Sequence, residues 1–336
     1  MNALLDADTP DTVRMSADEA TAFSIDALRR IGYADDDAQI ITGQLVDNAL
    51  CGYKYAGLPR ILTIAQDERA KQGRVPVKIM HESPLSALLD GGNNVGYIGA
   101  WRGAEVAIAK AQKSGMASVG VYNSFYSGRN AYYVEHIVRA GFVAFHIASS
   151  DPRILPPGAA APAFGTNPIC FGFPSENGPV TVDIGTASIM NGDMRLLALL
   201  GQPMPEGIGF DKRGEPTRDA KAVLSGGGVL PFGGHKGYGL AFAIQALGLL
   251  AGSALTHGQV QDFGFLFWVI DPKMMLPDNN FAQLMSELVR KIKATTRRPG
   301  VDEIRIPSER ATRERELRRQ QGVVIERKII AAINAL

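Results

Sequence analysis

The sequence has little of what marks a secreted, membrane-spanning or nucleic-acid-binding protein. It holds 2 cysteines in 336 residues, too few for a disulfide framework, and Cys51 and Cys170 lack the spacing of metal ligands. The formal net charge is +1 with acids and bases interspersed, so no basic face for nucleic acid is expected. The N-terminus shows no signal-peptide pattern, and no uncharged apolar run reaches membrane-spanning length. We therefore expect a cytoplasmic protein with no metal site and no membrane or nucleic-acid partner.

The common nucleotide-binding motifs are also missing. Short β-like runs at 117–122 and 142–147 flank a helical stretch at 130–140, a βαβ rhythm that invites a Rossmann interpretation. However, no Gly-x-Gly-x-x-Gly follows a strand, and Lys236 precedes Gly instead of the Ser or Thr of a Walker A motif. Residues 148–234 are rich in Gly and Pro, which predicts many short strands and long loops.

The two ends of the chain carry helical signals around this β-rich middle. Residues 1–15 are expected to be frayed, and Ser16 with Glu19 then predicts a helix with a capping box that ends at Gly32. The charge run 310–319 alternates in sign and is expected to be a solvated helix face. Further helices are predicted at 35–50, 101–114, 240–251, 280–294 and 322–336, with a strand at 263–270.

Two glycine-rich segments, 164–168 and 231–239, are the most informative features present. Glycine allows a backbone to approach a ligand closely, and Lys236 stands among backbone N–H groups just before the predicted helix. Backbone donors and the positive end of a helix both favour an anion such as a dinucleotide phosphate. The alternative interpretation is a pair of ordinary tight turns.

Several segments in the same order resemble the malate/L-lactate dehydrogenase-like oxidoreductases. This group is separate from the Rossmann-type lactate dehydrogenases and includes diketogulonate reductase, ureidoglycolate and sulfolactate dehydrogenases, and cyclic ketimine reductases. The resemblance runs from about residue 17 to the C-terminus, and it is strongest at 165–168, 182–188, 205–207, 214–217 and 233–239. Residues 306–309 resemble the family's Pro-Gly-Glu, with Ser308 in place of Gly.

The resemblance implies a homodimer of α+β subunits that uses NAD or NADP, with NADPH slightly favoured. It implies a helical, substrate-side part (1–115 and 276–336) around a β-rich, largely antiparallel, non-Rossmann cofactor-binding domain (116–275). Either Arg310 or Arg313 could neutralise the 2′-phosphate of NADP. Carried over by position, the cofactor contacts are Thr166, Asp183, Ile184, Gly185, Thr186, Ala187, Ser188, His235, Lys236, Ser308, Glu309 and Arg310.

The chain departs from the family at the catalytic residues. The family's Ser-His-Gly, with Arg three positions later, corresponds to Tyr55, Ala56, Gly57 and Arg60, and a second family His aligns with Tyr126. Arg60 is retained, and its planar guanidinium can bind a carboxylate through two parallel hydrogen bonds. Neither of the two expected histidines is present.

Three interpretations of this loss remain open. Reduction at C2 of a 2-oxo acid needs a proton donor, which Tyr126 or Tyr55 could supply if a cation such as Lys54 lowers the phenol pKa from about 10. A ketimine substrate, often already protonated at nitrogen, asks less of an enzymatic acid. The chain could also bind a dinucleotide without catalysis. The expected function is an NAD(P)-dependent dehydrogenase or reductase of a small 2-oxo or 2-hydroxy acid, with a ketimine reductase and a non-catalytic relative as alternatives.

Overall fold

The structure, a computed structural model, describes residues 10–256 and 259–336. The chain forms two compact units, which we call the helical unit (residues up to 74, and 287–336) and the sheet unit (75–286). The sequence-based division had placed residues 75–115 and 276–286 with the helical part, whereas they belong to the sheet unit. Strands β2 (Lys78–Glu82) and β3 (Ser86–Val95) and helix α4 (Gly96–Ser114) account for most of this difference, because they pack into the sheet unit.

The helical unit is built mainly from α-helices around a small apolar core. The predicted capping box is confirmed: the Glu19 N–H donates to Ser16 Oγ (3.1 Å) and the Ser16 N–H to Glu19 Oε2 (2.8 Å). Its elements are β1 (Thr12–Met15), α1 (Ala17–Arg30), α2 (Asp35–Leu50), the 3₁₀ helix η2 (Lys54–Ala56), α3 (Arg60–Gln66), α10 (Glu309–Gln321), β11 (Val323–Glu326) and α11 (Arg327–Asn334). The core residues are Ala20, Val46, Leu50, Leu58, Val323 and Ile325.

Three expectations for this unit were wrong. Residues 12–15 form strand β1, which pairs antiparallel with β11, so the start of the described chain is not frayed. The single closing helix predicted at 322–336 is divided into β11 and α11, because β-branched residues 323–325 pair with β1. The charge run is not fully solvated, since Arg315 and Arg318 are buried.

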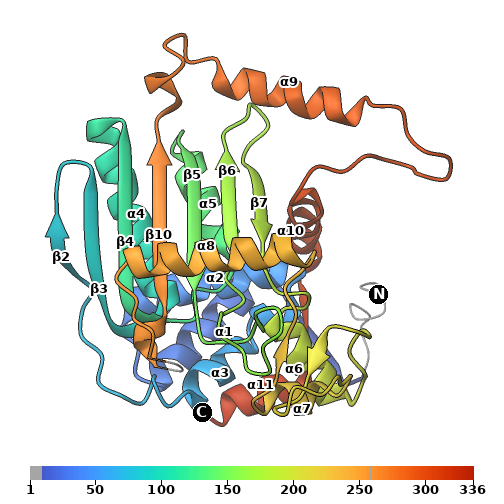
Figure 1. The fold of residues 1–336 in the computed structure, drawn as a ribbon. Helices are drawn as coiled ribbons and strands as arrows, with labels where there is room; N and C mark the ends of the chain where they lie inside the picture. The colour runs from blue at the N-terminus through green and yellow to red at the C-terminus, as the bar shows by residue number, and fades with distance from the viewer. Residues whose placement is uncertain (1–9, 257–258) are drawn as a thin grey trace. The chain divides into compact units, whose positions relative to one another are not determined.

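The sheet unit contains a seven-stranded sheet in the described part of the chain, with strand order β2-β3-β4-β10-β5-β6-β7 (Figure 1). Neighbouring strands are antiparallel except for the parallel pair β3–β4. The predicted α+β class and largely antiparallel sheet are confirmed. The strands are β2 (Lys78–Glu82), β3 (Ser86–Val95), β4 (Met116–Phe125), β5 (Val143–Ser149), β6 (Ile169–Phe173), β7 (Val180–Ile184) and β10 (Gly264–Ile270).

Strand β10 explains why the βαβ rhythm does not make a Rossmann sheet. Strands β4 and β5 flank helix α5 (Asn130–Arg139), as the sequence predicted, but β10 lies between them and is antiparallel to both. Strand β10 begins more than a hundred residues after the end of β5, yet it lies between β4 and β5 in the sheet. A local pattern cannot reveal such an insertion.

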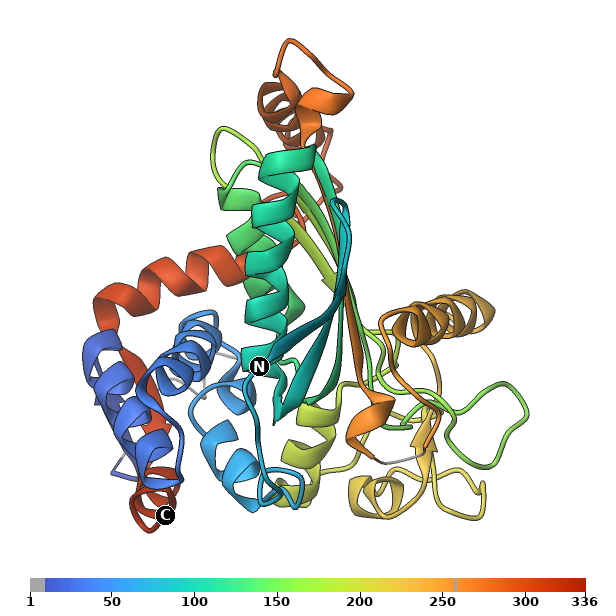
Figure 2. The same cartoon turned by 90° about the vertical axis from the view of Figure 1, so that its left-hand side faces the viewer.

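Helices cover the two faces of the sheet differently. Helix α4 (Gly96–Ser114) and α5 lie against one face, and α8 (His235–Leu250) crosses the other (Figure 2). Helix α9 (Phe281–Lys293) carries the chain from the sheet unit into the helical unit. No helix in the described ranges is long and apolar enough to cross a membrane.

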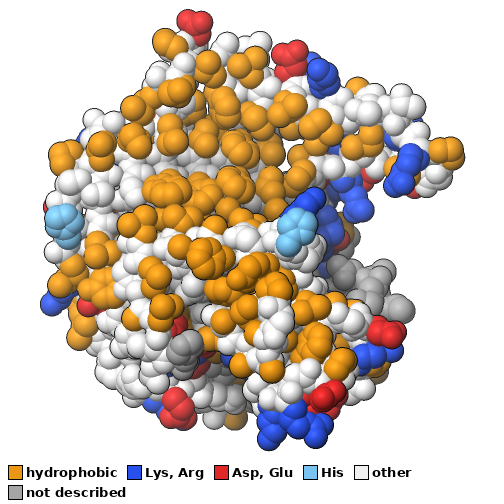
Figure 3. Space-filling view, in the orientation of Figure 1, with side chains coloured by type: hydrophobic (Ala, Val, Ile, Leu, Met, Phe, Trp, Pro, Cys, Tyr) orange, Lys and Arg blue, Asp and Glu red, His pale blue; other side chains and the backbone are white. Residues whose placement is uncertain are grey.

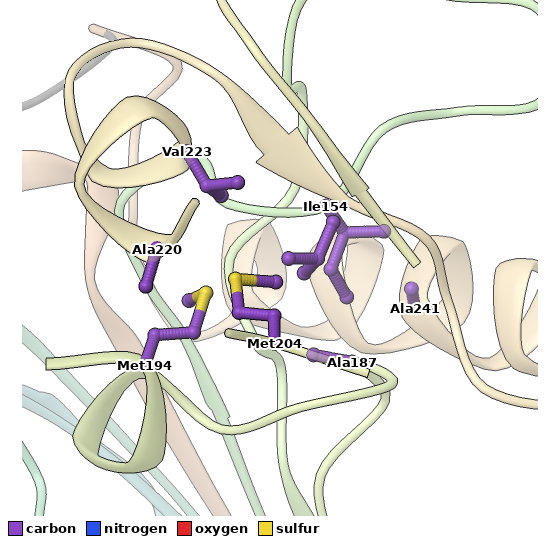
Figure 4. Close-up of a cluster of buried hydrophobic side chains, with 8 residues drawn as sticks. Ile154, Ala187, Met194, Met204, Ala220, Val223 and Ala241 are labelled. Carbon is purple, nitrogen blue, oxygen red and sulfur yellow. The ribbon is translucent and has the colours of Figure 1, made fainter. Parts of the chain in front are cut away.

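A second buried apolar cluster lies between residues 154 and 241. The stretch 148–234 contains the short strands that were predicted, but also helices α6 (Asn191–Leu200) and α7 (Ala220–Leu224), which were missed. Met204 lies in the middle of this cluster, with Met194 beside it (Figure 4). Its other buried members are Ile154, Ala187, Ala220, Val223, Val229 and Ala241, and the short pair β8 (Gly209–Phe210) and β9 (Gly228–Val229) lies in the same stretch.

Candidate functional site

Three segments predicted to contact a cofactor lie side by side in the sheet unit. The Thr166 carbonyl accepts hydrogen bonds from both the backbone N–H (2.9 Å) and the hydroxyl (3.0 Å) of Thr186. The Thr186 carbonyl in turn accepts from the Phe232 N–H (2.9 Å). The structure therefore brings together the 164–168, 183–188 and 231–239 segments, which the sequence treats as separate motifs.

The start of helix α8 presents an anion-binding geometry. The helix begins at His235, earlier than the predicted Leu240, so Lys236 lies in its first turn and both residues are exposed. Gly233 (φ 58°) and Gly234 (φ 62°) adopt left-handed backbone conformations that favour glycine. The first N–H groups of a helix have no intrahelical acceptor, and here no side chain caps them. Together with the Lys236 ammonium, these groups suit a phosphate.

A buried amide network fixes α8 against the preceding segment. Asn167 is fully buried, with φ 33°, and its Nδ2 donates to the Ala241 carbonyl and to Gln245 Oε1, both at 3.0 Å. Buried polar groups need such partners, so this network sets the position of α8 relative to residues 165–168. The sequence marked Asn167 only as part of a motif.

Some side chains carried over as cofactor contacts already have protein partners. The Asp183 carboxylate accepts from the Ala131 N–H (2.8 Å) and thereby caps the start of α5. Burial raises the pKa of Asp183, while the Ala131 N–H and Arg129 act in the opposite direction. Thr186 and Ala187 are buried, whereas Ile184 is exposed and Ser188 half-buried. A ligand at this segment would therefore meet the backbone, Ile184 and Ser188 rather than the Asp183 carboxylate.

In the helical unit, the segment that replaces the family's catalytic signature is held by α2. The Asn48 Nδ2 donates to the Ala56 carbonyl (3.0 Å), and a Cβ on Gly57 would lie 3.0 Å from the Ala49 Cβ, which explains the retained glycine. Arg60 is the first residue of α3 and is half-buried. The backbone of the signature is thus tightly positioned although its Ser and His are replaced.

Tyr55 lacks the electrostatic environment that an acidic phenol requires. Burial raises its pKa above the ordinary value near 10, and the charge of Glu326 raises it further. Lys54 precedes Tyr55 in η2, but the direction of the shift is opposite to that of a cation-activated phenol.

Tyr126 has an unusual backbone conformation. It follows the last residue of β4 with φ 60°, a left-handed value that is strained for an aromatic residue. Its half-buried ring makes edge contacts with Phe125 and Phe263, at centroid distances of 5.6 and 6.3 Å. Gly96 allows the close packing here, since its Cβ would lie 2.9 Å from the backbone of Tyr126. Strained residues concentrate at functional sites, so this observation favours Tyr126 over Tyr55.

The three predicted cofactor contacts at the start of α10, Ser308, Glu309 and Arg310, have different surroundings. Ser308 keeps the left-handed conformation (φ 62°) that suits the family's glycine. The Glu309 carboxylate is bound to Lys293 (2.5 Å), Arg313 (2.7 Å) and the Ile306 N–H (2.9 Å); burial alone would raise its pKa, but these partners outweigh burial and lower it. Arg310 instead lies over the Tyr53 ring, 5.2 Å from its centroid. No sequence pattern predicts this Tyr53 contact.

Comparisons with known proteins agree with the resemblance. The profile of the malate/L-lactate dehydrogenase family matches residues 15–334. The chain is 30% identical to the malate/(S)-sulfolactate dehydrogenase of Methanothermus fervidus over 96% of both chains, and 36% identical to a Δ1-pyrroline-2-carboxylate/Δ1-piperideine-2-carboxylate reductase of Pseudomonas putida over 69% of both. Among solved structures, malate dehydrogenase of Pyrococcus horikoshii OT3 superposes with a TM-score of 0.86 at 26% identity, covering 97% of this chain and 95% of that one.

Proposed function

Because the chain belongs to the malate/L-lactate dehydrogenase family, it is a nicotinamide-dinucleotide-dependent oxidoreductase, and we propose that it transfers hydride to or from C2 of a small 2-oxo or 2-hydroxy acid. The observation that supports this most is the exposed start of α8, where Lys236 and unpaired first-turn N–H groups lie beside the 166 and 186 segments. That arrangement fits a dinucleotide phosphate without a Rossmann motif.

Each remaining role follows from the chemistry of a side chain in this sequence. The nicotinamide, when bound, supplies or accepts the hydride. Arg60 would hold the substrate carboxylate through its guanidinium and so orient C2. The Tyr126 hydroxyl would donate its proton to the substrate oxygen as negative charge develops there. Ala56 has no group that can take this role.

A second candidate function is the reduction of cyclic ketimine carboxylates. The absence of both family histidines favours it, because an imine that is already protonated needs no strong enzymatic acid. The similarity to the Pseudomonas putida reductase also supports it. The non-catalytic alternative predicts dinucleotide binding without turnover of either substrate class.

The test compares two conservative variants, Tyr126→Phe and Tyr55→Phe, on 2-oxo acids and on cyclic ketimine carboxylates. If Tyr126 donates the proton, Tyr126→Phe lowers kcat for 2-oxo acids at least tenfold, while Tyr55→Phe leaves it nearly unchanged. Wild-type turnover confined to ketimines, equal in both variants, would establish the second function instead. Dinucleotide binding with no turnover of any substrate would support the non-catalytic alternative.

We further propose NADPH as the preferred cofactor, a homodimer as the assembly and the cytoplasm as the compartment. Cys51 and Cys170 are both buried and form no disulfide, which suits a reducing compartment. Support for the dimer comes from the exposed side of α8, where apolar side chains gather on one face of the sheet unit (Figure 3). Large exposed apolar patches mark interaction surfaces.

A further inference from the structure

Strands β3 and β4 of the sheet unit share an irregularity a few residues before Tyr126. Their regular parallel pairing stops after Asp90 and resumes at Asn94. Residues 91–93 of β3 therefore lie opposite a single residue of β4, Asn123. Extra residues of this kind bend a strand and change the direction of the side chains that follow. Tyr126 thus follows a bend in the sheet.

Left-handed backbone conformations are concentrated in this bend. Gly92 (φ 63°), Asn93 (φ 57°) and Asn123 (φ 52°) all have positive φ, and Tyr126 (φ 60°) follows three residues after Asn123. Asparagine adopts this conformation more readily than most residues, whereas a bulky aromatic residue rarely does. The conformation of Tyr126 therefore has to be maintained by the structure around it.

The Asp90 carboxylate joins the two strands across the bend. Its Oδ1 accepts hydrogen bonds from Asn123 Nδ2 on β4 (2.7 Å) and from the Gly92 N–H on β3 (2.8 Å). A carboxylate oxygen is a strong acceptor, and Asp90 and Asn123 are only partly exposed to water. These two bonds hold Asn123 in its left-handed conformation, three residues before Tyr126.

Buried side chains fix the strands on the other side of the bend. Asn94 Nδ2 donates to the carbonyls of Gly91 (2.8 Å) and Val75 (2.7 Å). The buried Ser124 hydroxyl donates to the Asn94 carbonyl (2.7 Å). Buried polar groups that find their partners in one arrangement make that arrangement specific. The bend is therefore a well-defined part of the sheet.

The backbone is also held on the C-terminal side of Tyr126. The hydroxyl of Tyr133, which is buried on α5, donates to the Ser127 carbonyl (2.5 Å). Gly96, the first residue of α4, packs so closely that an added Cβ would lie 2.9 Å from the Ser127 nitrogen. Asn123 before Tyr126 and Ser127 after it thus determine where the Tyr126 backbone lies.

We propose that Asn123, held by Asp90, is a positioning residue that orients the Tyr126 hydroxyl for proton transfer to the substrate. The proposal rests on the proposed function, in which Tyr126 is the proton donor. Asn123 acts through the backbone of residues 123–126. Misplacement of a reacting group by about 1 Å can lower a rate on the order of a hundredfold. Loss of the Asp90–Asn123 bond should therefore lower kcat without weakening dinucleotide binding.

The test measures kcat for 2-oxo acids in Asn123→Gly, alone and combined with Tyr126→Phe. Glycine adopts the left-handed conformation without strain but cannot bond to Asp90, so only the restraint is removed. We expect Asn123→Gly alone to lower kcat about tenfold. When Tyr126 is already Phe, Asn123→Gly should lower kcat no further, because the two residues act as one unit. The Kd for NADPH should not change.

Three further variants separate positioning from general damage to the fold. Asn279→Gly is the matched control, because Asn279 is also left-handed (φ 54°) but lies in the turn before α9, and it should keep wild-type kcat. Asp90→Ala should resemble Asn123→Gly. Asp90→Asn retains an acceptor oxygen for the Asn123 amide and should recover most of the activity that Asp90→Ala loses. Thermal melting confirms that each variant is folded.

The outcomes distinguish the positioning role from the proposed function. Wild-type kcat in Asn123→Gly, with a reduced kcat in Tyr126→Phe, would overturn the positioning role and leave the proton donor in place. An equal loss from Asn123→Gly with and without Tyr126→Phe would also overturn it, because Asn123 would then act independently of Tyr126. Full activity of Tyr126→Phe, or a wild-type protein that reduces no 2-oxo acid, would overturn both roles.

Discussion

His146 shows how one buried side chain couples the stability of the sheet unit to pH. The residue lies on β5 with no solvent exposure, donates from Nδ1 to the Leu266 carbonyl (3.0 Å), and stacks on Phe267 with centroids 3.9 Å apart. Burial lowers its pKa to about 3, and the Leu266 bond opposes this only in part. The imidazole is therefore neutral in the folded protein near pH 7, and a fully buried neutral imidazole does not replace the missing acid.

This lowered pKa predicts a pH-dependent loss of stability. Below about pH 6.5 the unfolded chain binds a proton at His146 that the folded chain does not bind. Stability therefore falls as pH decreases towards 3, by at most about 1.4 kcal/mol per pH unit from this group. The free energy of unfolding, measured with urea between about pH 6.5 and 4.5, should depend less steeply on pH in His146→Phe. The slope should fall by up to the equivalent of one bound proton. His81→Gln, on exposed strand β2, is the control and should retain the wild-type slope. An unchanged slope in His146→Phe would contradict the assignment.

Residue-level predictions from the sequence succeeded where a backbone requirement selects a residue type. The capping box of Ser16 and Glu19 belongs to this class, because its role depends on local conformation. Side-chain partners could not be predicted. Asp183 caps a helix that starts some fifty positions earlier, and Arg310 meets Tyr53 from the other end of the chain. Both contacts depend on the tertiary structure.

At the scale of elements, the start of α8 illustrates the limit of local patterns. The sequence predicts a helix from Leu240, since Gly237 and Gly239 lower helix propensity. The structure begins the helix at His235 because the left-handed turn at 233–234 and the close approach of Gly237 to Phe232 define it. A Cβ on Gly237 would lie 1.9 Å from the Phe232 carbonyl oxygen.

Two glycine-to-alanine changes in α8 separate packing from propensity. Gly237→Ala must displace the Phe232 backbone and the turn before it, so we expect at least tenfold weaker dinucleotide binding and lower stability. Gly239→Ala meets no atom within 4 Å and should stabilise the helix by about 1 kcal/mol. Fluorescence titration with NADPH and thermal melting measure the two effects. If both variants bind NADPH as tightly as the wild type does, the start of α8 does not hold the cofactor.

At the scale of the whole chain, the class of the fold was predictable but its connectivity was not. Helical ends and a β-rich middle follow from periodicity and composition. The pairing of β1 with β11 and the insertion of β10 between β4 and β5 join segments that are distant in sequence. The same applies to the unit boundary at residue 75, because nothing local shows that β2 and β3 extend the sheet.

The exposed surface of α8 leads to a prediction about assembly. A helix that is apolar on all sides is normally buried. Here Phe242 is 59% and Leu250 66% exposed, and the described residues around them on this face of the helix are apolar as well. The homodimer that we propose would cover this face. Phe242→Glu should then shift the protein towards monomer, because a buried, unpaired carboxylate is strongly unfavourable.

Sedimentation velocity over a range of protein concentrations measures this shift. Leu317→Glu is the matched control, because Leu317 is 46% exposed on the strongly charged helix α10, where the residues one turn before and after it are Arg313, Glu314, Gln320 and Gln321. It should associate like the wild type. If Phe242→Glu also remains dimeric, the subunits meet through another surface. A wild-type chain that sediments as a monomer at every concentration would rule out the dimer itself, and the apolar face of α8 would then need a different partner.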